Sequence, residues 1–195
     1  NLASAGKMFT AVAVLQQIAN GRLALDSTVG SVLKDYPNRE FADTVTVRQL
    51  LTHSAGAGDI ALFDVENAAN RMRVKTVSDM LALHSARAPE FIPGSQQKYG
   101  NFGHVVLGRM VEVLSGMDYE RYIIERIFKP AGMSQTTFTP CLNDAEDIAV
   151  SYLSLDGKRQ LNCATQPARG FPAGGQVSSA SDMHRFVRAL LDGKL

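Results

Sequence analysis

Several features that would by themselves point to a function are missing from this sequence of 195 residues. The longest unbroken apolar run has five residues, 11–15, whereas a membrane-spanning helix requires ~20. Twenty basic residues nearly balance nineteen acidic ones, and the resulting net charge of +1 gives no field that would attract nucleic acid or an anionic membrane. We therefore expect no transmembrane segment and no nucleic-acid partner.

Cysteine is also scarce, with Cys141 and Cys163 as the two thiols of the chain. Their spacing fits no metal-binding or redox motif. The pair could form a disulfide in an oxidising compartment, but we favour two isolated buried thiols. The sequence therefore predicts no metal site.

Hydrophobic periodicity predicts a mainly helical protein. Residues 8–19 are apolar on nearly all sides and end before Asn20 and Gly21, which is typical of a buried central helix. A helix is expected over 105–114, and others after the capping residues Thr46, Thr76, Asp118 and Ser179. The helix after Asp118 should end at Pro130. One hairpin is expected over 149–163, with its turn at Asp156 and Gly157.

A serine and a lone lysine form the first candidate constellation. Lys7 is the single charged residue between Asn1 and Gly21, and Ser4 precedes it by three residues. On a helix this spacing places both side chains on one face. Burial disfavours the ammonium form of lysine, and a neutral amine beside a hydroxyl is a general base beside a nucleophile. The alternative is that Ser4 only caps the helix and Lys7 extends outward to solvent.

Tyr99 and Asn101 form the second candidate constellation. They follow the turn at Pro93 and Gly94, and Gly100 between them permits close backbone approach. The tyrosine would relay a proton, while the asparagine would donate to a substrate carbonyl and orient the lysine. The alternative is a buried tyrosine followed by an asparagine that caps a helix.

These motifs, in this order, resemble those of the serine β-lactamases and penicillin-binding-protein-like hydrolases, on the class C side. That branch includes D-alanyl-D-alanine carboxypeptidases and related esterases. The segments that carry the resemblance are 1–10, 21–26, 50–56, 93–108, 127–133 and 173–179. They extend almost from one end of the chain to the other.

The resemblance implies a role for each candidate residue. Ser4 would be the acylated nucleophile, Lys7 its base, Tyr99 the proton relay and Asn101 a donor to the substrate amide. The substrate would be a small molecule, namely a β-lactam, a peptidyl-D-alanine or an ester, and no cofactor would be needed. A periplasmic or secreted location is also implied. The family segment that contains His53 is usually structural, so this histidine is left out of the chemistry.

Two departures from the family pattern bear on activity. Gly6 stands where the family usually has a hydroxyl-bearing or slightly larger residue, which could loosen the helix start. A third motif, Lys/His-Thr/Ser-Gly, is missing, since Lys75 and Thr76 are not followed by glycine. In the family that strand lies C-terminal to the region ending here and supplies an oxyanion donor, whose loss typically costs ~10²–10³ in turnover.

The expected fold class is therefore α+β. Residues 1–195 are expected to be a single β-lactamase-like domain, truncated at both ends. It would be the predominantly helical portion of the β-lactamase/transpeptidase-like fold with one hairpin, and most of the antiparallel sheet would be missing. An apolar helix over 8–19 would then expose surface and favour self-association. Two alternative functions stay open: a catalytically incomplete fragment or pseudoenzyme that acts as a binding or assembly module, and a helical scaffold whose Ser-x-x-Lys is accidental.

Overall fold

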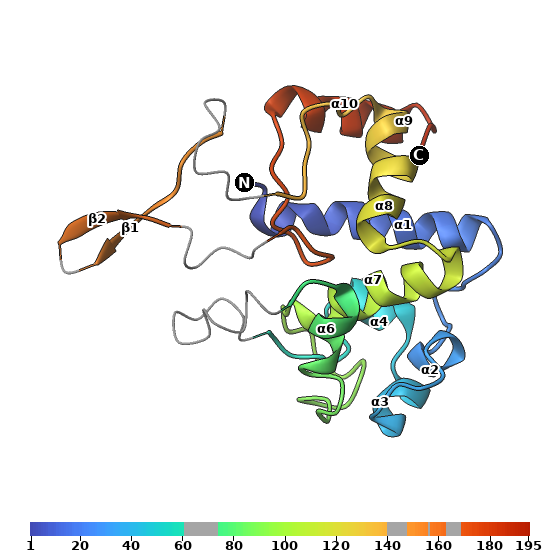
Figure 1. The fold of residues 1–195 in the computed structure, drawn as a ribbon. Coiled ribbons are helices and arrows are strands. Elements are labelled where there is room, and N and C mark those ends of the chain that lie inside the picture. The colour runs from blue at the N-terminus through green and yellow to red at the C-terminus, as the bar shows by residue number, and fades with distance from the viewer. Residues whose placement is uncertain (61–73, 140–147, 156, 163–168) are drawn as a thin grey trace.

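The computed structural model describes residues 1–60, 74–139, 148–155, 157–162 and 169–195, and the described residues are mainly helical (Figure 1). The longer helices are α1 (Lys7–Ala19), α7 (Phe102–Ser115) and α10 (Ala180–Leu191). The shorter ones are α2 (Val29–Val32), α3 (Arg39–Thr44), α4 (Val47–Leu51), α6 (Val77–Ala82), α8 (Tyr119–Ile123) and α9 (Lys129–Ala131). A 3₁₀ turn, Ala3–Gly6, precedes α1, and a π-helical turn, Ile124–Phe128, joins α8 to α9.

Helix α1 lies at the centre of the helical body, with α7 on one side and α10 on the other, and α8 crosses it (Figure 1). Phe9 is fully buried, and its ring meets the rings of Phe128 and Phe186 edge-on, each at 5.0 Å between centroids. The central helix predicted from the sequence is thus confirmed. Its burial is less complete than predicted, because Met8 and Leu15 remain 41% and 51% exposed.

Most predicted helix starts are confirmed by their capping bonds. Thr46 and Thr76 each form a complete capping box, with Gln49 and Asp79 respectively. Ser179 accepts a hydrogen bond from the backbone N–H of Asp182 at 3.1 Å. Asp118 does precede α8, but its side chain makes no capping bond, so that part of the prediction is wrong.

Pro130 does not end the helix that starts after Asp118, contrary to the prediction. The chain stays helical to Ala131 and ends at Gly132, whose φ is 73°. Proline has no N–H to offer the carbonyl four residues earlier, which belongs to Arg126. That carbonyl accepts instead from the side-chain amide of Gln16 on α1, at 3.2 Å. The neighbouring helix thus satisfies the carbonyl that proline leaves open.

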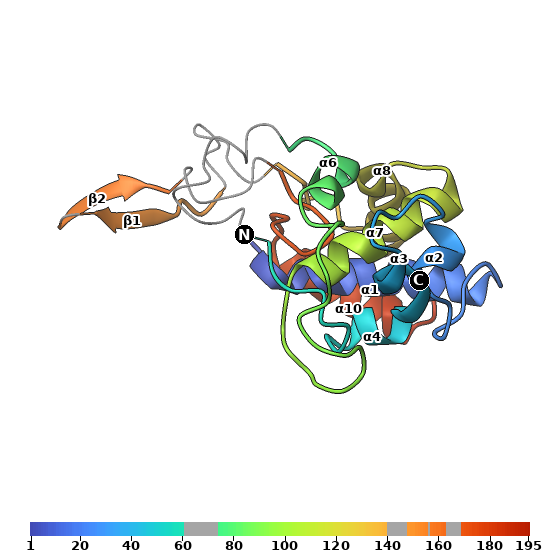
Figure 2. The same cartoon turned by 90° about the horizontal axis from the view of Figure 1, so that it is seen from below.

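The predicted hairpin is present but shorter. Strands β1 (Tyr152–Leu155) and β2 (Lys158–Leu161) pair antiparallel, with Leu155 opposite Lys158, and they form the one sheet of the described residues. The hairpin lies apart from the helices in both views (Figures 1 and 2). Cys141 and Cys163 fall outside the described residues, as does the prediction about their pairing. No helix in the described ranges combines the length and the apolar character needed to cross a membrane.

Candidate active site

Ser4 and Lys7 lie where the chain enters the central helix. Ser4 belongs to the 3₁₀ turn rather than to the predicted α-helix, and Lys7 is the first residue of α1. The serine is exposed, whereas the lysine is only 8% exposed. The alternative in which Lys7 extends outward to solvent is therefore wrong.

The amine of Lys7 is surrounded by four oxygen atoms. Its Nζ lies 3.0 Å from Oγ of Ser4 and 2.6 Å from the hydroxyl of Tyr99. It also lies 2.7 Å from Oδ1 of Asn101 and 2.8 Å from the backbone carbonyl of Ala173. The Tyr99 hydroxyl donates to Oγ of Ser4 at 2.7 Å. The structure thus brings together all four residues that the sequence singled out, from positions up to 97 residues apart (Ser4 to Asn101).

Tyr99 covers the amine from the solvent side. It is 54% exposed, so the alternative of a buried tyrosine is wrong, and its ring lies over Lys7 with Nζ at 4.8 Å from the centroid. The ring of Tyr99 also contacts the ring of His53, at 4.6 Å between centroids. The ring of His53 in turn stacks on the ring of His104, at 5.0 Å between centroids. His53 therefore supports Tyr99 sterically, a role that the sequence analysis did not assign to it.

Both histidines of this stack are held in the neutral form. Burial, followed by the Coulombic interactions with His53 and Lys7, lowers the pKa of His104 to about 3. Burial, followed by the charge of Lys7, also lowers the pKa of His53. A neutral stack adds no positive charge beside the amine of Lys7.

Asn101 precedes α7, but its side chain does not cap that helix. Its Oδ1 faces Lys7, while its Nδ2 donates to Oδ1 of Asp59 at 2.7 Å. Asp59 was missed by the sequence analysis, because it lies 42 residues away in an irregular loop where no periodicity or motif marks it. One of the two amide protons of Asn101 is therefore committed to Asp59.

The backbone carbonyl of Ala173 was also missed, although its segment was recognised as part of the framework. Residues 171–176 run beside the 3₁₀ turn, where Gly175 donates to the carbonyl of Ala3 at 3.0 Å and Leu2 donates to the carbonyl of Gln176 at 2.7 Å. Behind this segment, the hydroxyl of Thr10 donates to the carbonyl of Pro172 at 2.6 Å. The Ala173 carbonyl is thus held against Lys7 by bonds at both ends of its segment.

Gly6 is closely packed and does not loosen the start of the helix. A Cβ atom at this position would lie 1.9 Å from Oε1 of Gln176 and 2.9 Å from Cα of Gly174. The side chain of Gln176 is fully buried, and its Nε2 donates to the carbonyl of Phe171 at 3.1 Å. The glycine thus makes room for the segment that carries the Ala173 carbonyl.

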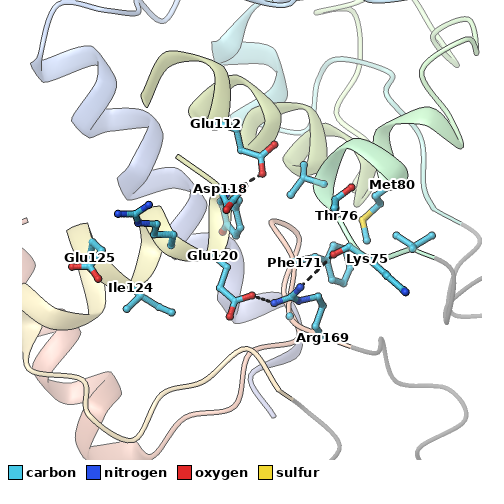
Figure 3. Close-up of a pocket in the computed structure, with 15 residues that line it drawn as sticks. Lys75, Thr76, Met80, Glu112, Asp118, Glu120, Ile124, Glu125, Arg169 and Phe171 are labelled. Carbon is cyan, nitrogen blue, oxygen red and sulfur yellow. Dashed lines mark hydrogen bonds and ion pairs between the residues drawn. The ribbon is translucent and has the colours of Figure 1, made fainter. Parts of the chain in front are cut away.

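A separate cavity of about 470 Å³ lies between α6, α7, α8 and residues 169–171 (Figure 3). None of the four predicted residues lines it. Its carboxylates are largely engaged: Glu120 pairs with Arg169, and Glu112 pairs with Arg109 and accepts from the backbone N–H of Tyr119. The cavity is therefore not the candidate active site. Within the described ranges, no three His, Cys, Asp or Glu side chains cluster so that they could hold a metal ion.

Known proteins are similar to this chain in both sequence and fold. The Beta-lactamase family profile matches residues 1–195. The putative penicillin-binding protein PbpX of Bacillus subtilis is 30% identical over 98% of this chain and 46% of its own length. Penicillin-binding protein 4 of Amycolatopsis lactamdurans is 31% identical over 97% of this chain and 50% of its own length.

The fold comparison agrees with the sequence comparison. The crystal structure of a penicillin-binding protein from Bacillus halodurans superimposes with a TM-score of 0.86 at 29% identity, covering 99% of this chain and 60% of that one. The chain spans about half the length of the curated relatives that it matches.

Proposed function

The chain belongs to the β-lactamase family, and from that premise we propose that it is a serine hydrolase in which Ser4 forms an acyl-enzyme. The observation that carries the proposal is the buried amine of Lys7, which lies 3.0 Å from the hydroxyl of Ser4. A serine hydroxyl is a weak nucleophile by itself, and a neighbouring general base is the usual means by which it is activated.

In the proposed acylation, Oγ of Ser4 attacks the substrate carbonyl and its proton passes to the amine of Lys7. The transfer has two routes, a direct one over 3.0 Å and one through the hydroxyl of Tyr99, with steps of 2.7 and 2.6 Å. The tetrahedral intermediate collapses as the bond to the leaving nitrogen or oxygen breaks, and the proton is returned to that atom. Water then attacks the ester, which releases the acid and restores Ser4.

Asn101 is proposed to bind the substrate through the amide proton that Asp59 does not use. Its Oδ1 meanwhile accepts from Lys7 at 2.7 Å, so that one side chain contacts both base and substrate. The proposed acyl donors are β-lactams, peptidyl-D-alanine and esters. All three present a carbonyl to the serine, and two of the relatives are named as penicillin-binding proteins. A periplasmic or extracellular site of action is part of this proposal.

Covalent labelling tests the assignment. After incubation with benzylpenicillin or a fluorophosphonate, mass spectrometry should find one adduct per chain, on Ser4. Ser4→Ala should abolish it, and Lys7→Ala should slow it about 10²–10⁴-fold, the usual contribution of a general base. Ser31→Ala is the matched control, because Ser31 is an exposed serine on α2 and should leave labelling unchanged. An adduct on another residue, or undiminished labelling of Ser4→Ala, would show that the nucleophile is misassigned.

A binding or assembly module is the second candidate function. A chromogenic cephalosporin and a p-nitrophenyl ester separate the two candidates. Release of chromophore over many turnovers supports the hydrolase, whereas binding without release of product supports the module.

A further inference from the structure

Asp59 holds Asn101 by two hydrogen bonds. Its Oδ1 accepts from the side-chain Nδ2 of Asn101 at 2.7 Å and from the backbone N–H of the same residue at 3.3 Å. The same oxygen accepts from the backbone N–H of Ile60 at 2.7 Å, which fixes the carboxylate relative to its own loop. Asp59 therefore fastens this loop to the chain at the residue that contacts Lys7.

A carboxylate only accepts hydrogen bonds, and this decides which end of the Asn101 amide faces it. The NH₂ group must point at Asp59, because the reversed amide would set its carbonyl oxygen against the carboxylate. The carbonyl oxygen of Asn101 consequently faces Nζ of Lys7, at 2.7 Å. The polarity of this amide is thus determined by Asp59.

The fixed amide in turn constrains the amine of Lys7. Two of its four neighbours, Oδ1 of Asn101 and the carbonyl of Ala173, can only accept. In the neutral amine, the two N–H groups donate to these two oxygens. The lone pair is then left to face the hydroxyls of Ser4 and Tyr99, at 3.0 and 2.6 Å.

Building on the proposed function, we propose that Asp59 is a positioning residue that keeps the lone pair of Lys7 directed at Ser4 and Tyr99. It does so by fixing the polarity of the Asn101 amide. If that amide reversed, its NH₂ group would donate to the lone pair, and the amine could not accept the proton of Ser4. Asp59 acts through Asn101, because its hydrogen bonds go to Asn101 and Ile60 and not to Ser4 or Lys7.

Asp59→Leu tests this role, because leucine is close to aspartate in shape but accepts no hydrogen bond, so that neither polarity of the Asn101 amide is favoured. We expect the maximal rate of Ser4 acylation by benzylpenicillin to fall about tenfold, which corresponds to about 1.4 kcal/mol. The concentration for half-saturation should stay within about twofold of wild type, because the base acts in the chemical step rather than in binding.

Asp43→Leu is the matched control, since it makes the same change at an exposed carboxylate paired with Arg39 on α3. It should react like wild type. An Asp59→Leu variant with a wild-type maximal rate would overturn the proposal. A fall in the maximal rate that is matched by an equal rise in the concentration for half-saturation, together with a lower melting temperature, would also overturn it. Asp59 would then only hold the loop in place.

The polarity of the Asn101 amide can also be measured on the wild-type chain, without catalysis. In a ¹⁵N-edited NOE spectrum, the Asn101 NH₂ signals, assigned by their loss in Asn101→Ala, should show contacts to the amide proton of Ile60, which shares Oδ1 of Asp59. Contacts to the ε-methylene of Lys7 in their place would mean that the amide is reversed and would overturn the proposal. If wild-type Ser4 is not acylated while the Ile60 contact is present, the proposed function fails and the amide polarity set by Asp59 stands.

Discussion

At the residue scale, the candidate site depends on how Gly6, which has no side chain, packs against the buried side chain of Gln176. Gly6 has no Cβ, and the end of the Gln176 side chain occupies the space where one would be, 1.9 Å from the ideal position. The sequence suggested that this glycine weakens the start of the helix. The structure gives it a packing role, because residues 174–176 can approach the 3₁₀ turn only where no Cβ intervenes.

Gly6→Ala should therefore destabilise the protein by about 1–3 kcal/mol, the usual cost of overpacking a filled interior. Urea unfolding followed by circular dichroism measures this change. Gly103→Ala is the control. It lies within α7, its Cβ would meet the nearest atom at 3.4 Å, and replacing a helical glycine stabilises by about 0.5–1 kcal/mol. Equal effects of the two substitutions would contradict the packing argument. Adding Gln176→Ala to Gly6→Ala should restore part of the loss.

At the element scale, helix α1 contributes both to the candidate site and to the aromatic core. Its first residue, Lys7, is buried in the candidate site, and Phe9 anchors the aromatic core. On another face, Met8 and Leu15 are one heptad apart and are 41% and 51% exposed. Residues at this spacing lie on the same side of a helix, so the two side chains belong to one open apolar stripe.

These two exposed side chains predict self-association of the isolated chain, because exposed apolar surface favours contact with a second copy. Sedimentation velocity should show a concentration-dependent increase in mass, and Leu15→Lys should shift the distribution toward monomer. Val113→Lys is the control, since Val113 is 45% exposed on a different helix, α7. A wild-type chain that stays monomeric at every concentration would refute the expectation.

At the scale of the whole molecule, a buried neutral histidine links folding to pH. Burial lowers the pKa of His104 from 6.5 to about 3 in the folded protein, while the unfolded chain keeps the ordinary value. As the pH falls below 6.5, the unfolded state binds a proton that the folded state does not. The free energy of unfolding should therefore fall between pH 6.5 and about 3, by up to about 1.4 kcal/mol per pH unit.

Denaturant unfolding at pH 7, 6, 5 and 4 measures this slope. His104→Phe keeps an aromatic ring against His53 but removes the titrating group, and it should flatten the slope. His184→Gln is the control, because His184 is exposed on α10 and its loss should leave the slope as in wild type. Identical slopes for wild type and His104→Phe would show that another group governs the pH dependence.

Local signals in the sequence were sufficient for the elements whose stability is local. The capping residues Thr46, Thr76 and Ser179 and the helix over 105–114 were predicted correctly, because a capping bond or an apolar stripe is built from neighbours in the chain. The prediction failed at Pro130, where a side chain from a distant helix satisfies the carbonyl that proline leaves open. Such compensation has no local sequence signal.

For the candidate site, the sequence by itself determined the chemical types: a hydroxyl three residues before a lone lysine, and a tyrosine and an asparagine on a glycine-containing turn. The tertiary structure alone decided that these groups meet, that Lys7 is buried, and that Asp59 and the Ala173 carbonyl complete their surroundings. The physical reason is that a hydrogen bond depends on distance and direction in space. Residues 42 or 166 positions apart acquire both only when the chain folds.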